Sequence, residues 1–161
     1  MQRGGITIAL SRNQVLKMKG SLVKSRPRVL VVEDNEGLRT VLCEQLACAA
    51  YTVQGVRDGI EAVMELEDRR WDVVLTDCSM PRMNGLDLLG IITACWPDTP
   101  VVMTSGESPE QAKLALKHGA FAWIHKPYDL THLLQTVRAA VQQTLELRAQ
   151  SERGQRQGSG R

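Results

Sequence analysis

Short, unbroken runs of apolar, mostly β-branched residues recur along this 161-residue chain. Runs of this kind, without polar alternation, are typical of strands that are buried on both faces of a parallel sheet. Between the runs, apolar residues return every three or four positions, as in helices that cover a sheet with one face. This alternation predicts an α/β fold, namely a doubly wound, five-stranded parallel sheet with helices on both faces.

Five βα units can be placed along the middle of the chain. The predicted strands are 28–32, 51–56, 72–76, 101–104 and 121–124. Most of the helices that follow begin at residues whose side chains cap free backbone N–H groups. The predicted helix starts are Asn35, Asp58, Ser108 with Pro109, and Asp129.

Charge divides the chain into three parts. Residues 1–28 hold seven basic and no acidic residues, and residues 148–161 hold four arginines against one glutamate. The whole chain has a net charge of only +2, so the body between these ends is acidic. We expect a flexible basic extension over 1–26, one domain over 27–147, and a disordered polar tail over 148–161.

The sequence also bears on the cellular compartment. It contains no apolar run near the roughly 18 residues that a membrane helix needs, and no signal-peptide pattern at its start. The four cysteines form no CxxC pair, as expected for reduced thiols. We therefore expect a cytoplasmic protein that does not contact the membrane.

Charged and hydroxyl residues follow four of the predicted strands. Glu33 and Asp34 follow the first strand, Asp77 the third, Ser105 the fourth and Lys126 the fifth. In doubly wound sheets, ligands bind at the carboxyl ends of the strands. Three converging carboxylates favour a hard divalent cation such as Mg²⁺. The lysine and the hydroxyl would then face a second anion, which favours a phosphoryl group.

The motifs around these residues resemble a known family. The matching stretches are the strand that ends in Glu33-Asp34-Asn, the block from Asp72 to Gly85, the stretch from Pro100 to Gly106, Gly119-Ala120, and Lys126-Pro127. Together they resemble the CheY-like receiver domain of two-component response regulators, over about residues 27–147. The resemblance implies the strand order 2-1-3-4-5 of the flavodoxin-like group of folds.

The resemblance also implies a phosphorylation site. Asp77 would be the phosphoacceptor. Mg²⁺ would be bound by Asp34 directly, by Glu33 through water, by Asp77, and by the backbone carbonyl of Ser79. Lys126 would pair with the phosphoryl oxygens, and the Lys126-Pro127 peptide bond would be cis.

Further positions of the family motif would transmit and tune the signal. Ser105 would donate to the phosphoryl group, and Trp123 occupies the aromatic switch position. Ser79 and Glu107 occupy positions that tune the lifetime of the acyl phosphate. Phosphorylation would reshape the surface formed by the helix from 109, the last strand and the final helix.

The resemblance implies a signalling phosphoacceptor rather than an enzyme. A sensor histidine kinase or a histidine phosphotransfer protein would donate the phosphoryl group, and an unknown downstream protein would read the switched surface. Phosphorylation-dependent homodimerisation stays open. Only 14 residues follow Leu147, too few for an attached output domain, so we expect a receiver that acts through protein partners.

Parts of the sequence also fit other classes of protein. The chain could be the receiver module of a hybrid histidine kinase, or its basic flanks could bind nucleic acid, although we expect solvated flanks. In a flavodoxin, Glu33 and Asp34 would repel the phosphate of FMN. A haloacid-dehalogenase-type phosphatase needs a second Asp two residues after the first, and that position holds Ser79.

Overall fold

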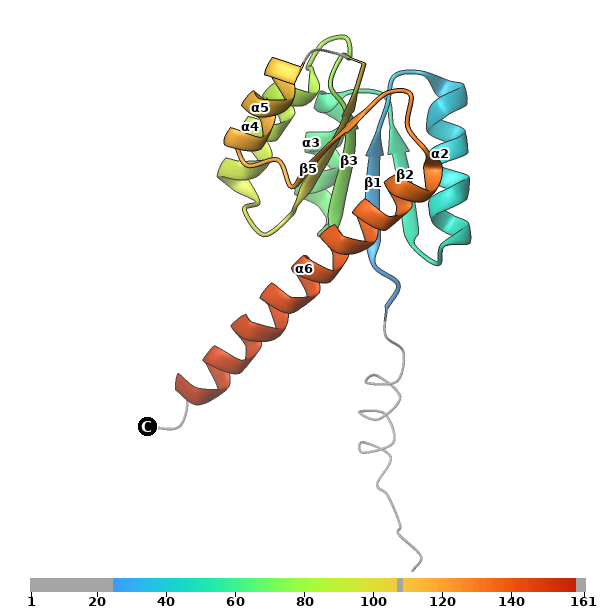
Figure 1. The fold of residues 1–161 in the computed structure, drawn as a ribbon. Helices are drawn as coiled ribbons and strands as arrows, with labels where there is room; N and C mark the ends of the chain where they lie inside the picture. Colours follow the sequence, from blue (N-terminus) through green and yellow to red (C-terminus); the bar gives the residue numbers. More distant parts are fainter. Residues whose placement is uncertain (1–24, 107–108, 159–161) are drawn as a thin grey trace, which may run out of the picture.

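A computed structural model of the chain describes residues 25–106 and 109–158. Its centre is a sheet of five parallel strands in the order β2-β1-β3-β4-β5 (Figure 1). The strands are β1 (Arg28–Val32), β2 (Thr52–Val56), β3 (Val73–Asp77), β4 (Val101–Ser105) and β5 (Ala122–His125). The predicted α/β fold and strand order are therefore confirmed.

Within the described residues, five helices cover the two faces of the sheet (Figure 1). They are α2 (Glu36–Cys48), α3 (Gly59–Asp68), α4 (Gly85–Cys95), α5 (Pro109–Lys117) and α6 (Leu130–Gly158). Buried side chains of α3, α4 and α5 pack with one face of the sheet, and those of α2 and α6 pack with the other. Two apolar cores result, one on each side of the strands.

The burial of each strand follows from its place in the sheet. Every residue of the central strands β3 and β4 is buried, which explains their continuous apolar sequences. The edge strand β2 is only partly buried. Its sequence accordingly includes a threonine, a glutamine and a glycine.

Polar side chains begin the helices as predicted. The Asn35 side chain accepts from the backbone N–H of Leu38, at 2.9 Å. The Asp58 side chain accepts from the first N–H groups of α3, and Asp129 does the same for α6. Each cap satisfies backbone donors that the helix itself leaves without partners. Ser108, the fourth predicted cap, lies outside the described residues.

The final helix corrects one prediction. The sequence predicts a disordered tail over 148–161, whereas α6 continues to Gly158 and projects past the sheet (Figure 1). The segment lacks the apolar stripe that identifies a packed helix, but it contains no proline and is rich in residues that favour helix. Neither α6 nor any other helix within residues 25–106 and 109–158 is apolar enough over its length to cross a membrane.

A buried aspartate ties α6 to the amino-terminal edge of the sheet. Asp72 precedes β3, and its carboxylate accepts from the backbone N–H of Arg28 at 2.6 Å and pairs with Arg148 of α6. The Thr144 hydroxyl donates to the Asp72 carbonyl at 2.7 Å. Arg148 also donates to the carbonyl of Trp71, at 3.2 Å. Four contacts thus converge where α6 leaves the sheet.

Replacing Arg148 with alanine should test this attachment. The ion pair with Asp72 is largely shielded from water, so we expect the Arg148→Ala variant to lose about 1–2 kcal/mol of unfolding free energy in urea titrations. Arg153→Ala removes an exposed arginine further along the same helix, and it should change stability by less than about 0.5 kcal/mol. Equal losses in the two variants would contradict the proposed anchoring role.

Candidate functional site

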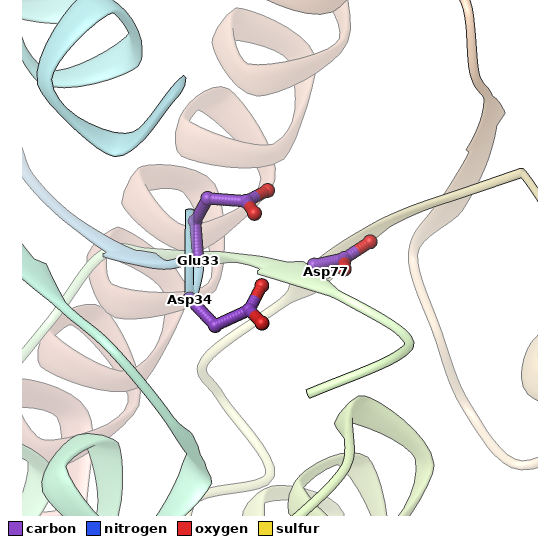
Figure 2. A group of neighbouring side chains, drawn as sticks. All are labelled: Glu33, Asp34 and Asp77. Atoms are coloured by element: carbon purple, nitrogen blue, oxygen red, sulfur yellow. The ribbon is translucent and has the colours of Figure 1, made fainter. Parts of the chain in front are cut away.

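Three carboxylates meet at the carboxyl edge of the sheet. Figure 2 shows Glu33 and Asp34 at the end of β1 beside Asp77 at the end of β3. Because β1 and β3 are adjacent and paired in register, the residues that follow Val32 and Thr76 emerge together. One ligand oxygen from each of the three side chains lies within 4.8 Å of the others. The convergence predicted from the strand ends is therefore present.

Lys126 brings the opposite charge to these carboxylates. It follows β5, and its Nζ lies 2.9 Å from Oδ1 of Asp77 and 3.2 Å from Oε2 of Glu33. Its backbone N–H donates to the carbonyl of Ser105 at 2.7 Å. The Lys126-Pro127 peptide bond is cis, as the resemblance implied.

Burial and neighbouring charges change the acidity of this cluster. Burial raises the pKa of Glu33 above its usual value, and the charge of Asp77 adds to the increase, while Lys126 opposes it. Burial lowers the pKa of Lys126, but its contacts with Asp77 and Glu33 outweigh this effect, so the pKa lies above its usual value. The ammonium group is therefore held in its charged form by the carboxylates around it.

The cluster has the chemistry of a magnesium site. Three carboxylates face one ammonium group, so a negative charge remains to be compensated. Glu33 and Asp77 are almost fully buried, whereas Asp34 is exposed. Oxygen ligands with one side open to water are what Mg²⁺ prefers. The residues present thus fit a hard divalent cation.

The other predicted site residues differ in how deeply they are buried near the carboxylates. Ser105 is buried at the end of β4, and Ser79 is exposed in the loop after β3. An open cavity of about 450 Å³ is lined by Asp34 and Ser79 among others. Trp123 is half-buried on β5 and packs against the core under α3, α4 and α5. Glu107 lies outside the described residues.

The loop between β3 and α4 is held closely against the strand. The backbone N–H of Gly85 donates to the carbonyl of Cys78 at 2.8 Å. A Cβ atom at position 85 would lie only 2.3 Å from the carbonyl oxygen of Asp77. Only glycine permits this approach, so Gly85 lets the loop return directly beneath the Asp77 backbone.

Two arginines that the sequence analysis did not single out hold the surrounding backbone. Arg82 sits in the loop after β3 with φ of 67° and forms an ion pair with the buried Asp58 at the start of α3. Arg39, in the first turn of α2, donates to the backbone carbonyls of Glu33 and Asp34. The sequence does contain a signal that could have identified Arg39. It is a positively charged residue at the amino-terminal end of a helix, where cations are unfavourable.

Comparison with protein families agrees with this geometry. Residues 29–138 match the family model described as the response regulator receiver domain. The response regulator MprA of Mycobacterium sp. (strain KMS) is 33% identical over 118 residues, which are 73% of this chain and 51% of MprA. The chain thus spans about half the length of the curated relatives it matches.

Solved structures show the same likeness. The chemotaxis response regulator CheY4 of Vibrio cholerae is 30% identical, with a TM-score of 0.68 over 72% of this chain and 99% of CheY4. The response regulator TrrA of Thermotoga maritima, solved in complex with Mg²⁺-BeF, is 25% identical, with a TM-score of 0.65 over 71% of this chain and 98% of TrrA.

The two glycines of α4 should respond oppositely to alanine. Gly85→Ala places a Cβ against the Asp77 carbonyl, so we expect it to lose about 1–3 kcal/mol of unfolding free energy. At Gly90, no described atom would lie within 4 Å of the new Cβ, and Gly90→Ala should gain roughly 0.5–1 kcal/mol from helix propensity. Chemical denaturation of both variants tests the pair, and a stabilising Gly85→Ala would disprove the close approach.

Removing the Lys126 ammonium group should change the acidity of Glu33. Because that charge lowers the pKa of Glu33, the Lys126→Met variant should show a higher Glu33 pKa in a carboxyl NMR titration without divalent cation. A carboxyl whose pKa is raised by folding contributes stability at low pH. This contribution is lost as pH rises from the unfolded to the folded pKa, so the loss should extend to higher pH in the variant.

Lys117 provides the matched control for this titration. It is an exposed lysine in the last turn of α5, so Lys117→Met should leave the titration of Glu33 unchanged. An unaltered or lowered Glu33 pKa in Lys126→Met would contradict the electrostatic arrangement described above.

Proposed function

Because this chain belongs to the family of response regulator receiver domains, we propose that Asp77 accepts a phosphoryl group from a phosphohistidine donor. Receiver domains are signalling phosphoacceptors of two-component systems rather than enzymes. Glu33, Asp34, Asp77 and the backbone carbonyl of Ser79 would hold Mg²⁺ at the acceptor. The donor would be a sensor histidine kinase or a histidine phosphotransfer protein.

The position of Lys126 is the observation that carries this proposal. In a simple structural ion pair, one cation balances the charge of one acid. Here a single ammonium group contacts both Asp77 and Glu33, and Asp34 lies nearby. The excess negative charge suits a site that also receives a divalent cation. The relative TrrA, solved with Mg²⁺-BeF, supports the same interpretation.

The transfer itself requires little from the protein beyond positioning. An oxygen of the Asp77 carboxylate attacks the phosphorus atom as the phosphorus–nitrogen bond of the donor breaks, and the imidazole leaves with the bonding electron pair. Mg²⁺ held by Glu33, Asp34 and Asp77 would supply positive charge that offsets the negative charge of the phosphoryl group. Lys126, whose Nζ lies 2.9 Å from Oδ1 of Asp77, would orient that carboxylate and then pair with a phosphoryl oxygen of the acyl phosphate.

Phosphorylation would then act through the neighbouring strand ends. The Ser105 hydroxyl would donate to the phosphoryl group, and Lys126, whose N–H is bonded to the Ser105 carbonyl, would move with it. Trp123, which lies on β5, would follow this movement. The changed surface would comprise α5, β5 and the first turns of α6, where a downstream protein or a second copy would bind.

Two further residues would set how long the signal lasts. Ser79 lies in the exposed loop beside Asp34 and lines the same open cavity. Side chains there can control how a water molecule reaches the acyl phosphate. Glu107 is proposed for the same role from its position in the sequence motif.

The decisive variant is Asp77→Asn. We expect incubation with Mg²⁺ and acetyl phosphate to add one phosphoryl group to the wild-type chain, detected by intact mass, because a carboxylate is the required nucleophile. The amide of Asp77→Asn should give no adduct. Asp87→Asn, which alters an exposed acid in the first turn of α4, should be phosphorylated like the wild type.

Removal of the metal provides the second half of this experiment. Excess EDTA should abolish phosphorylation of the wild type, and added Mg²⁺ should restore it. An adduct that survives in Asp77→Asn, or a wild-type chain that acquires none, would overturn the proposal.

A further inference from the structure

Arg39 reaches back over the acidic turn from the first turn of α2. Its Nη1 atom donates to the carbonyl oxygen of Glu33 at 2.7 Å and to that of Asp34 at 3.3 Å. The Cα–Cβ bonds of a helix tilt toward its amino terminus, so a side chain in the first turn points at the residues before the helix. One guanidinium nitrogen thus bridges the backbone of two neighbouring carboxylate residues.

The position of Arg39 is unfavourable for the helix alone. The amino terminus of a helix carries a partial positive charge, which is unfavourable for a cation placed there. The helix already has its cap, because Asn35 accepts from the N–H of Leu38. The charge of Arg39 therefore does not stabilise this end of α2.

The edge strand β2 provides the space that Arg39 uses. A Cβ at Gly55 would lie 2.9 Å from Sγ of Cys43, 3.0 Å from Cγ of Arg39 and 3.2 Å from its Cδ. The aliphatic stem of the arginine therefore passes over a strand position without a side chain. Because Gly55 pairs with Val31 of β1, this passage leads to the end of β1, where the acidic turn begins.

We propose that Arg39 is a positioning residue for the metal site. Its side chain passes through the space left by the absent side chain of Gly55 and fixes the backbone of Glu33 and Asp34. This inference rests on the proposed magnesium site. Glu33 is further restrained by Lys126 and by the backbone N–H of Asn35, at 3.2 Å. Asp34 is exposed, so its carboxylate depends more on the backbone that Arg39 holds.

The main test compares magnesium binding by Arg39→Ala with that by the wild type. Groups that orient metal ligands typically contribute 10–100-fold to metal affinity, so we expect Mg²⁺ affinity to fall at least about tenfold. Affinity is measured by the rise in melting temperature with added Mg²⁺ and by tryptophan fluorescence titration. Arg138→Ala, which removes an exposed arginine of α6, should bind Mg²⁺ like the wild type.

A conservative variant separates positioning from folding. Arg39→Lys keeps the positive charge and most of the stem but not the planar guanidinium group. We expect its Mg²⁺ affinity to lie between those of the wild type and Arg39→Ala, with a metal-free melting temperature close to that of the wild type. This variant provides the answer if Arg39→Ala does not fold.

Gly55→Ala tests the same contact from the other side. The added methyl group should displace the arginine stem together with the thiol of Cys43, and the displacement of the arginine should weaken Mg²⁺ binding. Once Arg39 is alanine, the same methyl group should have little further effect on binding, so the double variant should bind no more weakly than Arg39→Ala. Additive losses of Mg²⁺ affinity would show that the two positions act independently. They would contradict the proposal that Gly55 provides the space for the Arg39 side chain.

The outcomes distinguish this inference from the function on which it rests. A wild-type chain that does not bind Mg²⁺, or an Asp34→Asn variant that binds it equally well, would overturn the metal site itself. The second case is a wild-type chain that binds Mg²⁺ and an Asp34→Asn variant that does not. Normal Mg²⁺ affinity in Arg39→Ala or Arg39→Lys would then overturn the role of Arg39 alone. A lowered metal-free melting temperature with unchanged Mg²⁺ affinity would show that Arg39 only supports the fold.

Discussion

The repulsion among Glu33, Asp34 and Asp77 is the constraint on which the rest of this structure depends. Two of these acids are almost fully buried, where like charges repel strongly because water screens them little. Lys126 reduces that repulsion but contacts both Asp77 and Glu33, so it cannot balance all three charges. The remaining negative charge is of the kind that a hard divalent cation compensates.

The sheet brings these charges together through its strand order rather than through local sequence. β1 and β3 are neighbours, although a strand and two helices separate them along the chain. The contribution of β5 comes from further away, because β4 lies between it and β3. The backbone contacts at Gly85 and Arg39 then bring the loops close to the strand ends. The acidic cluster thus results from topology, and its detailed geometry results from the contacts that hold the two loops.

Much of the fold could be predicted from the sequence because its signals are local. The continuous apolar runs identified the buried strands, and Asn35, Asp58 and Asp129 marked helix starts that the structure confirms. The end of α6 could not be predicted, since helical residues beyond the core carry no apolar pattern. The basic residue near the start of α2 is a local signal for Arg39, but the contacts of its side chain could not be predicted, because they depend on the missing side chain of Gly55 on another element. Pairings between distant elements have no local signal.

The two ends of β3 show how a fully compensated buried acid differs from a partly compensated one. Asp72 and Asp77 are similarly buried, at 6% and 8% exposure. Asp72 has a backbone N–H from Arg28 and its own arginine, Arg148, so its charge is satisfied where α6 is attached. Asp77 shares one lysine with Glu33 and lies beside a further carboxylate. A buried charge that the protein compensates fully contributes to the fold, whereas one compensated only in part remains available to bind a ligand.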